Sequence, residues 1–422
     1  MDARERIDQA LEDLRPEALS LLQTLVRIPT LPGEEKGAQD VIATKMSEMG
    51  LELDIFDPVD PGLRSHPAYV PSDIPYAGRP NVVGTWKGSG GGKSLIFNGH
   101  VDVVPTGEER KWTHAPWGGD YVDGRVYGRG AADMKAGCVV NLMVVKVLQK
   151  AGLRLKGDIV LQSVVDEESG GNGTLACVLR GYTGDGMVFT EPSGDSALGI
   201  AQRGAQFFRL KVAGIEGPIE HRHELVNPIG KALQVYQAVE AYSLWRESTV
   251  SHPLYDPYYQ TKVPLAICKI LGGEWASTIP SACYLEGSIE ALPGEDIETV
   301  KADFKSYLAA LRLQDGWFEQ HPIEVEWWGL RLESAQIDIE HPLVQAMARE
   351  IERVIGHRPI IGGGGGCDLR LPVLYGNTPA VIYGPRGGMV HCVDEYVEFA
   401  QVLNCTKVLA NLATNWCSLA DE

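Results

Sequence analysis

The sequence predicts an α/β protein with a mostly parallel central sheet, interrupted by an inserted α+β domain. Up to about residue 202, apolar strand-like runs alternate with helix-like segments, and this order returns after about residue 326. Between these points, strands of alternating polarity accompany two long helices. Because 422 residues are many for one core, we expect one domain over 1–202 and 326–422, with a second domain, 203–325, inserted into it.

The first domain is predicted from apolar runs of strand length that end in polar residues. These runs are LIFNGHVDVV (95–104), DIVLQSVVDEE (158–168) and MVFTEPS (187–193). CVVNLMVVKVLQKAG (138–152) is a helix between the first two runs, and 341–356 and 393–413 are helices around a buried strand at 378–385. Strands that alternate with helices favour a parallel sheet, in which sites form outside the carboxyl ends of the strands.

The inserted domain is predicted from strands that follow one another with turn residues between them. The expected strands are RGAQFFRLKVAG (203–214), VPLAICKILGG (263–273), ACYLEGSIEALPG (282–294) and PIEVEWWG (322–329). The two helical patterns cover 227–248 and 296–313. Two helices and about four antiparallel strands form a self-contained α+β layer pair.

Composition excludes several classes of partner. The net charge of −18 and the pI near 5.0 oppose binding to nucleic acid, whose phosphates require a basic face. The sequence has no apolar run near the roughly 20 residues that span a bilayer, and its first residues lack the pattern of a signal peptide. Eight scattered cysteines are typical of reduced thiols. We therefore expect a cytoplasmic protein with no membrane or nucleic-acid partner.

Histidines and carboxylates at the predicted strand ends form a candidate metal site. They occur in the phrases GHVDVVP (99–105), GRGAADMKAG (128–137), DEESGG (166–171), TEPS (190–193) and HCVDEY (391–396). Imidazole and carboxylate groups suit a pair of divalent metals such as Zn²⁺, which leave positions open for water. The candidate ligands are His100, Asp133, Glu168, Glu191 and His391, with Glu167 as a base. This set points to metal-assisted hydrolysis.

Each phrase by itself has a structural alternative. His100 and Asp102 could be an ordinary pair at a strand end, Asp133 could cap the following helix, and the run 166–168 could be a solvated acidic loop. An apolar strand leads straight into that acidic run, however, and burying adjacent carboxylates without a cation is costly. The order and common location of the phrases favour a metal site. Asp102 is a candidate to orient His100, because metal-bound imidazoles usually donate to a carboxylate.

Together these phrases resemble the co-catalytic zinc metallopeptidases that include aminoacylase, acetylornithine deacetylase, succinyl-diaminopimelate desuccinylase and glutamate carboxypeptidase. RPNVVGTW (79–86), PWGGDYVDGRVYGRGAADMK (116–135), GGCDLR (365–370) and NTPAVIYGP (377–385) add to the resemblance. It implies a zinc-peptidase-like catalytic domain interrupted by a lid and dimerisation domain. It also implies a homodimer or a higher homo-oligomer.

The resemblance also implies roles for the site residues. One metal is held by His100, Asp133 and Glu191, and the other by Asp133, Glu168 and His391. The metals are zinc, manganese or cobalt, and occupancy of one or both positions stays open. Glu167 acts as the general base that takes a proton from water and delivers it to the leaving amine, and Asp102 orients His100.

The lid departs from the family pattern. Relatives usually carry a histidine in the phrase G-x-x-x-His-Ala, which polarises the substrate carbonyl, and Pro218 stands there in this chain. GSIE (287–290) likewise stands where many relatives have an Asp-x-Arg ending. The candidate substrate contacts are His221, His223, Asn227 and Arg370. Substrate recognition is therefore expected to differ from that of ordinary relatives.

Three functions remain open from the sequence. The first is a metal-dependent hydrolase of small molecules that cleaves a C–N bond, as an N-acyl amino acid deacylase or small-peptide amidohydrolase. The second is an aminohydrolase that removes an amine from an activated aromatic substrate such as a nitroanthranilate, a reaction that needs no carbonyl-polarising histidine. The third is a non-catalytic metal-binding relative. Retention of both Glu167 and Glu168 opposes the third.

Overall fold

The computed structural model describes residues 1–421 and divides into two compact units. Unit 1 contains Met1–Ala201 and the chain from Gln336 onward, and unit 2 is Gln202–Ala335. The first boundary nearly coincides with the expected one. The second lies at 335 instead of 325, because β14 (Glu324–Leu332) pairs with β9 (Gly204–Ala213) inside the sheet of unit 2.

The main sheet of unit 1 is mixed. Its order is β1-β2-β6-β3-β7-β17-β8-β15, with β16 paired to β8. Pairs β6–β3, β3–β7 and β7–β17 are parallel, whereas β1–β2, β2–β6 and β17–β8 are antiparallel. The α/β fold class is therefore confirmed, but the parallel arrangement is limited to the central strands. The strands are β1 (Glu52–Phe56), β2 (Asn81–Trp86), β3 (Leu95–His100), β6 (Ile159–Val164), β7 (Met187–Phe189), β8 (Ala197–Gln202), β15 (Ala335–Gln336), β16 (Ile360–Gly364) and β17 (Ala380–Ile382).

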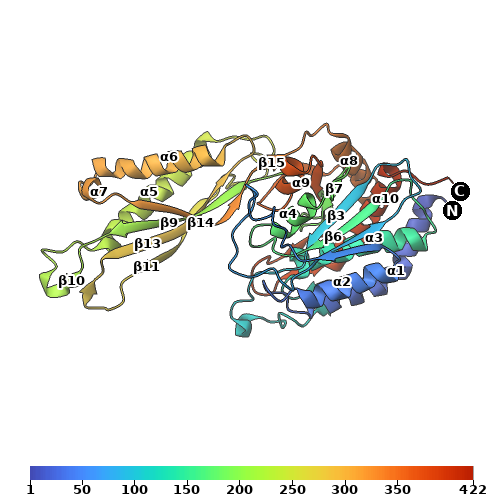
Figure 1. The fold of residues 1–422 in the computed structure, drawn as a ribbon, viewed down its shortest axis with the longest axis horizontal. Helices are drawn as coiled ribbons and strands as arrows, with labels where there is room; N and C mark the ends of the chain where they lie inside the picture. Colours follow the sequence, from blue (N-terminus) through green and yellow to red (C-terminus); the bar gives the residue numbers. More distant parts are fainter. Residues whose placement is uncertain (422) are drawn as a thin grey trace. The chain divides into compact units, whose positions relative to one another are not determined.

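Helices cover this sheet (Figure 1), and α3 (Ala136–Lys150) is buried over most of its length. It packs against β3 and β6 and also against α1 (Ala3–Val26) and α10 (Phe399–Trp416), so it is apolar on nearly all sides. The other helices of unit 1 are α2 (Lys36–Glu48), α4 (Asn172–Leu179), α8 (Pro342–Ile355) and α9 (Arg370–Tyr375). Among the described residues, no helix is both long and apolar enough to cross a membrane.

A small antiparallel sheet lies in the same unit, beside the loop that carries Asp133. Its order is β18-β19-β5-β4, and in the sequence β18 precedes His391 whereas β19 follows it. Segments far apart in the sequence thus frame one loop. The strands are β4 (Asp120–Val122), β5 (Arg125–Tyr127), β18 (Gly387–Gly388) and β19 (Tyr396–Glu398).

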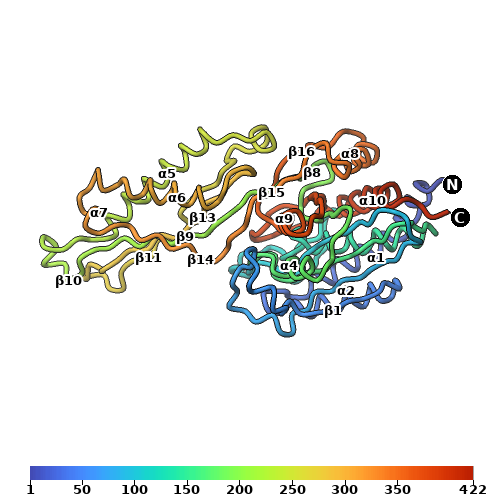
Figure 2. Tube along the Cα trace, turned by 45° about the horizontal axis from the view of Figure 1, so that its top comes forward, coloured from blue at the N-terminus to red at the C-terminus, as the bar shows by residue number. Residues whose placement is uncertain are grey.

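Unit 2 is an α+β layer pair, as its sequence pattern predicts. The sheet order is β11-β13-β9-β14, and every neighbouring pair is antiparallel. Helices α5 and α6 lie on one face of this sheet (Figure 1), and β9 and β14 run side by side in both views (Figure 2). The core between helices and sheet is apolar and includes Phe208, Tyr242 and Phe304. The elements are β10 (Gly217–Pro218), α5 (Pro228–Thr249), β11 (Leu265–Gly272), β12 (Thr278–Ile279), β13 (Ala282–Ala291), α6 (Ile297–Ala309) and α7 (Trp317–Gln320).

Candidate metal centre

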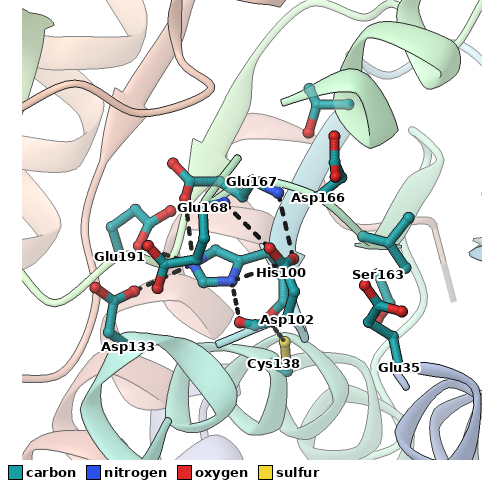
Figure 3. Close-up of polar contacts among 12 residues, drawn as sticks. Glu35, His100, Asp102, Asp133, Cys138, Ser163, Asp166, Glu167, Glu168 and Glu191 are labelled. Atoms are coloured by element: carbon teal, nitrogen blue, oxygen red, sulfur yellow. Dashed lines mark hydrogen bonds and ion pairs between the residues drawn. The ribbon is translucent and has the colours of Figure 1, made fainter. Parts of the chain in front are cut away.

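The candidate ligands gather at one edge of the main sheet. Strand β3 ends at His100, β6 ends just before Asp166, and β7 ends just before Glu191. Because these neighbouring strands are parallel, their carboxyl ends meet at one edge. Figure 3 shows carboxylates surrounding the imidazole of His100.

The Nε2 atom of His100 is the centre of this group. It lies 3.1 Å from Oδ1 of Asp133 and 3.8 Å from a carboxylate oxygen of both Glu167 and Glu191. The imidazole is 1% exposed. Three acidic side chains from separate loops therefore face one nitrogen of a buried histidine.

The other nitrogen of His100 determines which atom faces the carboxylates. Its Nδ1 lies 2.9 Å from the backbone oxygen of Asp102. A carbonyl oxygen only accepts hydrogen bonds, so Nδ1 carries the hydrogen and the neutral ring presents its Nε2 lone pair to Asp133. Two acceptors at 3.1 Å require a cation between them, either a proton or a metal ion. Burial opposes protonation, but Glu191, Asp133 and Glu167 outweigh it and raise the pKa of His100 well above its usual range.

His391 forms the second half of the site. Its Nε2 lies 3.1 Å from Oε1 of Glu168 and 3.2 Å from Oδ2 of Asp133. Asp133 thus presents Oδ1 to His100 and Oδ2 to His391, the arrangement of a carboxylate that bridges two ions. The ligand atoms of His100, Asp133 and Glu168 all lie within 4.8 Å of one another.

The charges of the site fit divalent metal ions. Burial, with further repulsion from neighbouring carboxylates such as Asp368 and Glu168, raises the pKa values of Glu167 and Glu191 well above the usual range, although His100 attracts both carboxylates. Burial also raises the pKa of Asp133, but hydrogen bonds from His100 and His391 outweigh it and leave that pKa low. Carboxylate and imidazole donors with an excess of buried negative charge suit zinc and similar ions.

Asp102 is fully buried, and its carboxylate contacts the main chain of the acidic turn. Its Oδ1 accepts a hydrogen bond from Glu167 N at 3.2 Å, and its Oδ2 accepts one from Glu168 N at 3.1 Å. Oδ1 is 3.7 Å from Nδ1 of His100, beyond a hydrogen bond. His100 is therefore oriented by the backbone carbonyl of Asp102, whereas the carboxylate aligns the two glutamates. Burial raises the pKa of Asp102 to about 7.

Glu395 has a comparable role for Asp133, although no pattern in the sequence assigns that role to it. Its Oε1 accepts hydrogen bonds from the backbone N–H groups of Ala132 and Asp133, at 3.0 and 3.1 Å. Its other oxygen is 2.5 Å from Nη1 of Arg129. Glu395 lies in the same HCVDEY phrase as His391. That phrase was the available signal, but the contact with a backbone 262 residues away is visible only in the fold.

The four candidate substrate contacts are placed differently. Arg370 is fully buried in unit 1 and donates to the carbonyl of Gly170 at 2.8 Å, so this structure leaves it no surface for a substrate. Its contact with a substrate stays a prediction, and in this structure its guanidinium contacts a loop.

The other three lie in unit 2. Asn227 is the N-cap of α5 and accepts a hydrogen bond from Ile229 N at 3.0 Å. His221 is exposed, and His223 is exposed and 3.2 Å from Glu224. Pro218 is exposed in β10, which pairs with β12. Their contact with a substrate remains a prediction.

The geometry agrees with the family to which the chain belongs. The model of peptidase family M20/M25/M40 matches residues 96–415, and the chain is a member of this family. The chain is 29% identical over 455 aligned residues to the N-formyl-4-amino-5-aminomethyl-2-methylpyrimidine deformylase of Bacillus subtilis (strain 168), covering 99% of this chain and 98% of the relative. It is 28% identical over 404 residues to the succinyl-diaminopimelate desuccinylase of Rhodopseudomonas palustris (strain BisA53), covering 93% and 96%.

Solved structures show the same fold. The di-peptidase Dug1p from Saccharomyces cerevisiae superimposes with a TM-score of 0.77 at 16% identity, with both chains fully covered. Family, relatives and site together define the class. The chain is a hydrolase of the M20 family that acts on carbon–nitrogen bonds.

Proposed function

We propose that this protein is a divalent-metal-dependent amidohydrolase that removes a small acyl group from an amine, with an N-formylated heterocyclic amine as its preferred substrate class. The observation that carries the reaction type is the position of Glu167. Its carboxylate lies 3.8 Å from Nε2 of His100, as that of the proposed ligand Glu191 also does, but Glu167 directly precedes the ligand Glu168 and its backbone N–H donates to Asp102. Its raised pKa suits a group that accepts a proton and then releases it.

The residues of this chain divide the work of hydrolysis. Bound divalent ions would supply the positive charge that polarises the acyl oxygen and makes water more acidic. Glu167 takes a proton from water while the oxygen of that water bonds to the acyl carbon. The C–N bond then breaks, and Glu167 returns the proton to the leaving amine. Asp102 holds the backbone of Glu167 so that the carboxylate keeps its direction.

We propose two ion positions that share Asp133. The first uses His100, Asp133 and Glu191, and the second uses Asp133, Glu168 and His391. Zinc, manganese and cobalt all suit such donors. Metal analysis after loading with each ion tests this: we expect up to two ions per chain, and a large loss in Asp133→Ala. An Asp133→Ala variant that binds as much metal as the wild type would contradict the shared ligand.

The substrate class rests on unit 2 and on the relatives. Pro218 replaces the usual lid histidine. Glu290, at the position of the usual arginine of the Asp-x-Arg ending, is mostly buried and paired with Arg203 at 2.5 Å. The second difference disfavours a substrate whose carboxylate needs a cationic partner, and such a carboxylate is the common feature of N-acyl amino acids. The deformylase relative is named for a formylated aminomethylpyrimidine without a carboxylate.

A substrate panel separates the candidates. The metal-loaded protein is assayed with N-formyl-4-amino-5-aminomethyl-2-methylpyrimidine, N-acetyl and N-succinyl amino acids, dipeptides and a nitroanthranilate. We expect release of formate from the first at a kcat/KM at least tenfold above the others. Preference for an N-acyl amino acid or a dipeptide would contradict the proposed substrate class and would indicate the deacylase or peptidase activity of ordinary relatives. Release of ammonia from the nitroanthranilate would establish the aminohydrolase reaction instead.

We further propose a homodimer, or a higher homo-oligomer, formed through unit 2 in the cytoplasm. Apolar side chains are exposed on α5, where Leu244 is 71% exposed, and on the edge strand β11, where Leu271 is 52% exposed. An unpaired edge strand with such residues favours pairing with another chain. Sedimentation tests it: Leu271→Lys should weaken the dimer, whereas Leu313→Lys, at a more exposed leucine of the same unit, should not. A monomeric wild type at micromolar concentration would contradict the proposal.

A further inference from the structure

Asp166 lies next to the proposed base Glu167 but takes no part in the ligand set. Its side chain is 1% exposed. Oδ2 accepts a hydrogen bond from the hydroxyl of Tyr76 at 2.6 Å and one from Nδ2 of Asn172 at 3.3 Å. Oδ1 is 3.4 Å from Nη2 of Arg79. Three donors therefore converge on the carboxylate that precedes the base.

Arg79 is held in turn by Glu35. Its Nη2 lies 2.5 Å from Oε1 of Glu35, and its Nε lies 3.0 Å from Oε2. Both side chains are at most 2% exposed. Two buried carboxylates share one guanidinium here, and buried ion pairs of this kind seldom stabilise a fold more than apolar residues would. A role in geometry explains the network better than a role in stability.

The backbone of Asp166 shows why its side chain needs to be held. Its φ is +72°, in the left-handed region that residues other than glycine rarely adopt. Such a conformation is strained and persists only where the surroundings determine it. This bend directs the chain away from β6, so that the N–H groups of Glu167 and Glu168 reach the carboxylate of Asp102. The turn is thus fixed on one side by Asp102 and on the other by the donors to Asp166.

The donors come from the long loop between β1 and β2 and from the start of α4. Tyr76 and Arg79 lie in this loop. Asn172 is the first residue of α4 and connects the helix to the loop by hydrogen bonds. Its Nδ2 donates to the Tyr76 hydroxyl at 2.7 Å and to Val70 O at 2.6 Å. Figure 3 shows Asp166 on the far side of the acidic turn from Asp133, with Glu35 below it. In the hydrogen bonds given above, Tyr76, Arg79 and Asn172 donate to Asp166, Glu35, Val70 or Tyr76, and not to the side chain of a candidate metal ligand.

We propose that Tyr76, Arg79 and Asp166, supported by Glu35 and Asn172, form a positioning clamp that sets the direction of the Glu167 carboxylate. These are positioning residues, since they act through the backbone of the turn. The inference rests on the proposed role of Glu167 as the base. Displacing a reacting group by about 1 Å can cost about 10²-fold in rate. Loosening the clamp should therefore lower kcat, while KM and metal content stay nearly constant.

Tyr76→Phe is the sharpest test, because it removes one hydroxyl and keeps the ring. Tyr182→Phe is a matched control in unit 1, since its hydroxyl also donates to an aspartate, Asp54, at 2.7 Å. We expect kcat of Tyr76→Phe to fall about 10- to 10²-fold with KM within about twofold, and no change in Tyr182→Phe. Equal kcat values in the two variants would overturn the clamp.

Hydrogen exchange of the metal-free protein gives a readout that does not depend on activity. The amides of Glu167 and Glu168 should exchange faster in Tyr76→Phe than in wild type, and at the wild-type rate in Tyr182→Phe. Unchanged exchange together with reduced kcat would show that Tyr76 acts in some other way, and would also overturn the clamp.

Asp166→Gly and Asp166→Asn distinguish the clamp from simple relief of strain. Glycine accepts φ +72° but offers no acceptor, whereas asparagine keeps one oxygen for Tyr76. The clamp predicts a larger loss of kcat in the glycine variant. Wild-type kcat in Asp166→Gly would mean that only the bend matters. If Glu167→Gln keeps full activity, the proposed function fails, and the exchange result still decides the clamp separately.

Discussion

The two units differ in what they bury. The largest fully buried side chains of unit 1 include Arg79, Arg129, Lys135 and Arg370, and the core of unit 2 is built on Phe208 and Phe304. Unit 2 also buries Arg246 and most of Arg203, but their partners Glu295 and Glu290 are 25% and 21% exposed. Most of its other ion pairs, such as Lys211–Glu324, lie on exposed parts of the sheet.

This difference separates residues that serve the site from residues that serve the fold. Burying a charge is costly unless it is paired and hydrogen-bonded, so a unit that buries many charges loses stability relative to an apolar one. In unit 1 these charges lie beside the backbone of Asp133 and of the acidic turn. In unit 2 they are absent from the described apolar core. Four experiments test this contrast.

The largest effect is expected from removal of the base in unit 1. Glu167→Gln keeps the shape of the side chain but cannot accept a proton, so kcat should fall about 10²–10⁴-fold with metal content retained. Glu324→Gln, on the exposed sheet of unit 2, should leave kcat unchanged. Glu168→Gln should instead lose metal. Reversed behaviour of the two neighbouring glutamates would contradict the assignment of base and ligand.

The second largest effect is expected from Arg129→Met, which should lower the free energy of unfolding. It leaves Glu395 buried without its cation, and such a change typically costs about 3–5 kcal/mol. Urea unfolding of the metal-free protein measures it. Arg129→Met with Glu395→Leu should recover much of the loss yet bind metal more weakly, because the N–H groups of Ala132 and Asp133 lose their acceptor. Full metal affinity in the double variant would show that Glu395 serves only the fold.

The third effect is a pH dependence of stability that arises from His391 in unit 1. Hydrogen bonds with Asp133, and then with Glu168, raise the pKa of His391 to about 10 in the metal-free protein, against about 6.5 in an unfolded chain. The folded state therefore holds this proton more tightly. Its contribution to stability is fully present below about pH 6.5 and is lost as the pH rises through about 10. Since the side chain is 48% exposed, solvent screening reduces the contribution.

The observable is the difference in unfolding free energy between wild type and His391→Asn without metal. It should shrink as the pH rises from about 6.5 to about 10. The difference is needed because burial lowers the pKa of Lys135 to about 7, which changes the stability of both proteins in the opposite direction. A difference that stays constant or grows with pH would contradict the ion pairs of His391.

The smallest effect is expected on the exposed sheet of unit 2. Lys211→Met removes a cation that is 40% exposed and paired with a glutamate that is 67% exposed. Surface pairs of this kind contribute about 0–1 kcal/mol. The free energy of unfolding measured in urea should therefore change by no more than that. A loss comparable with that of Arg129→Met would remove the contrast between the units.

Much of the site could be predicted from the sequence, because its residues follow strands. His100 ends β3, and the acidic turn and Glu191 follow β6 and β7. Apolar runs indicate strands, and neighbouring parallel strands end at one edge, so these side chains had to meet. The alternating strands of unit 2 likewise predicted its antiparallel sheet.

Only the tertiary structure decided which atoms meet. It assigned the backbone oxygen of Asp102 to His100 and the carboxylate to the glutamates, and it placed Arg370 in the interior. It also joined Tyr76 to Asp166, 90 residues apart, and Arg129 to Glu395, 266 residues apart. Local patterns report the period of an element and the face it buries. A hydrogen bond between distant loops depends on the path of the whole chain, so no local pattern in the sequence records it.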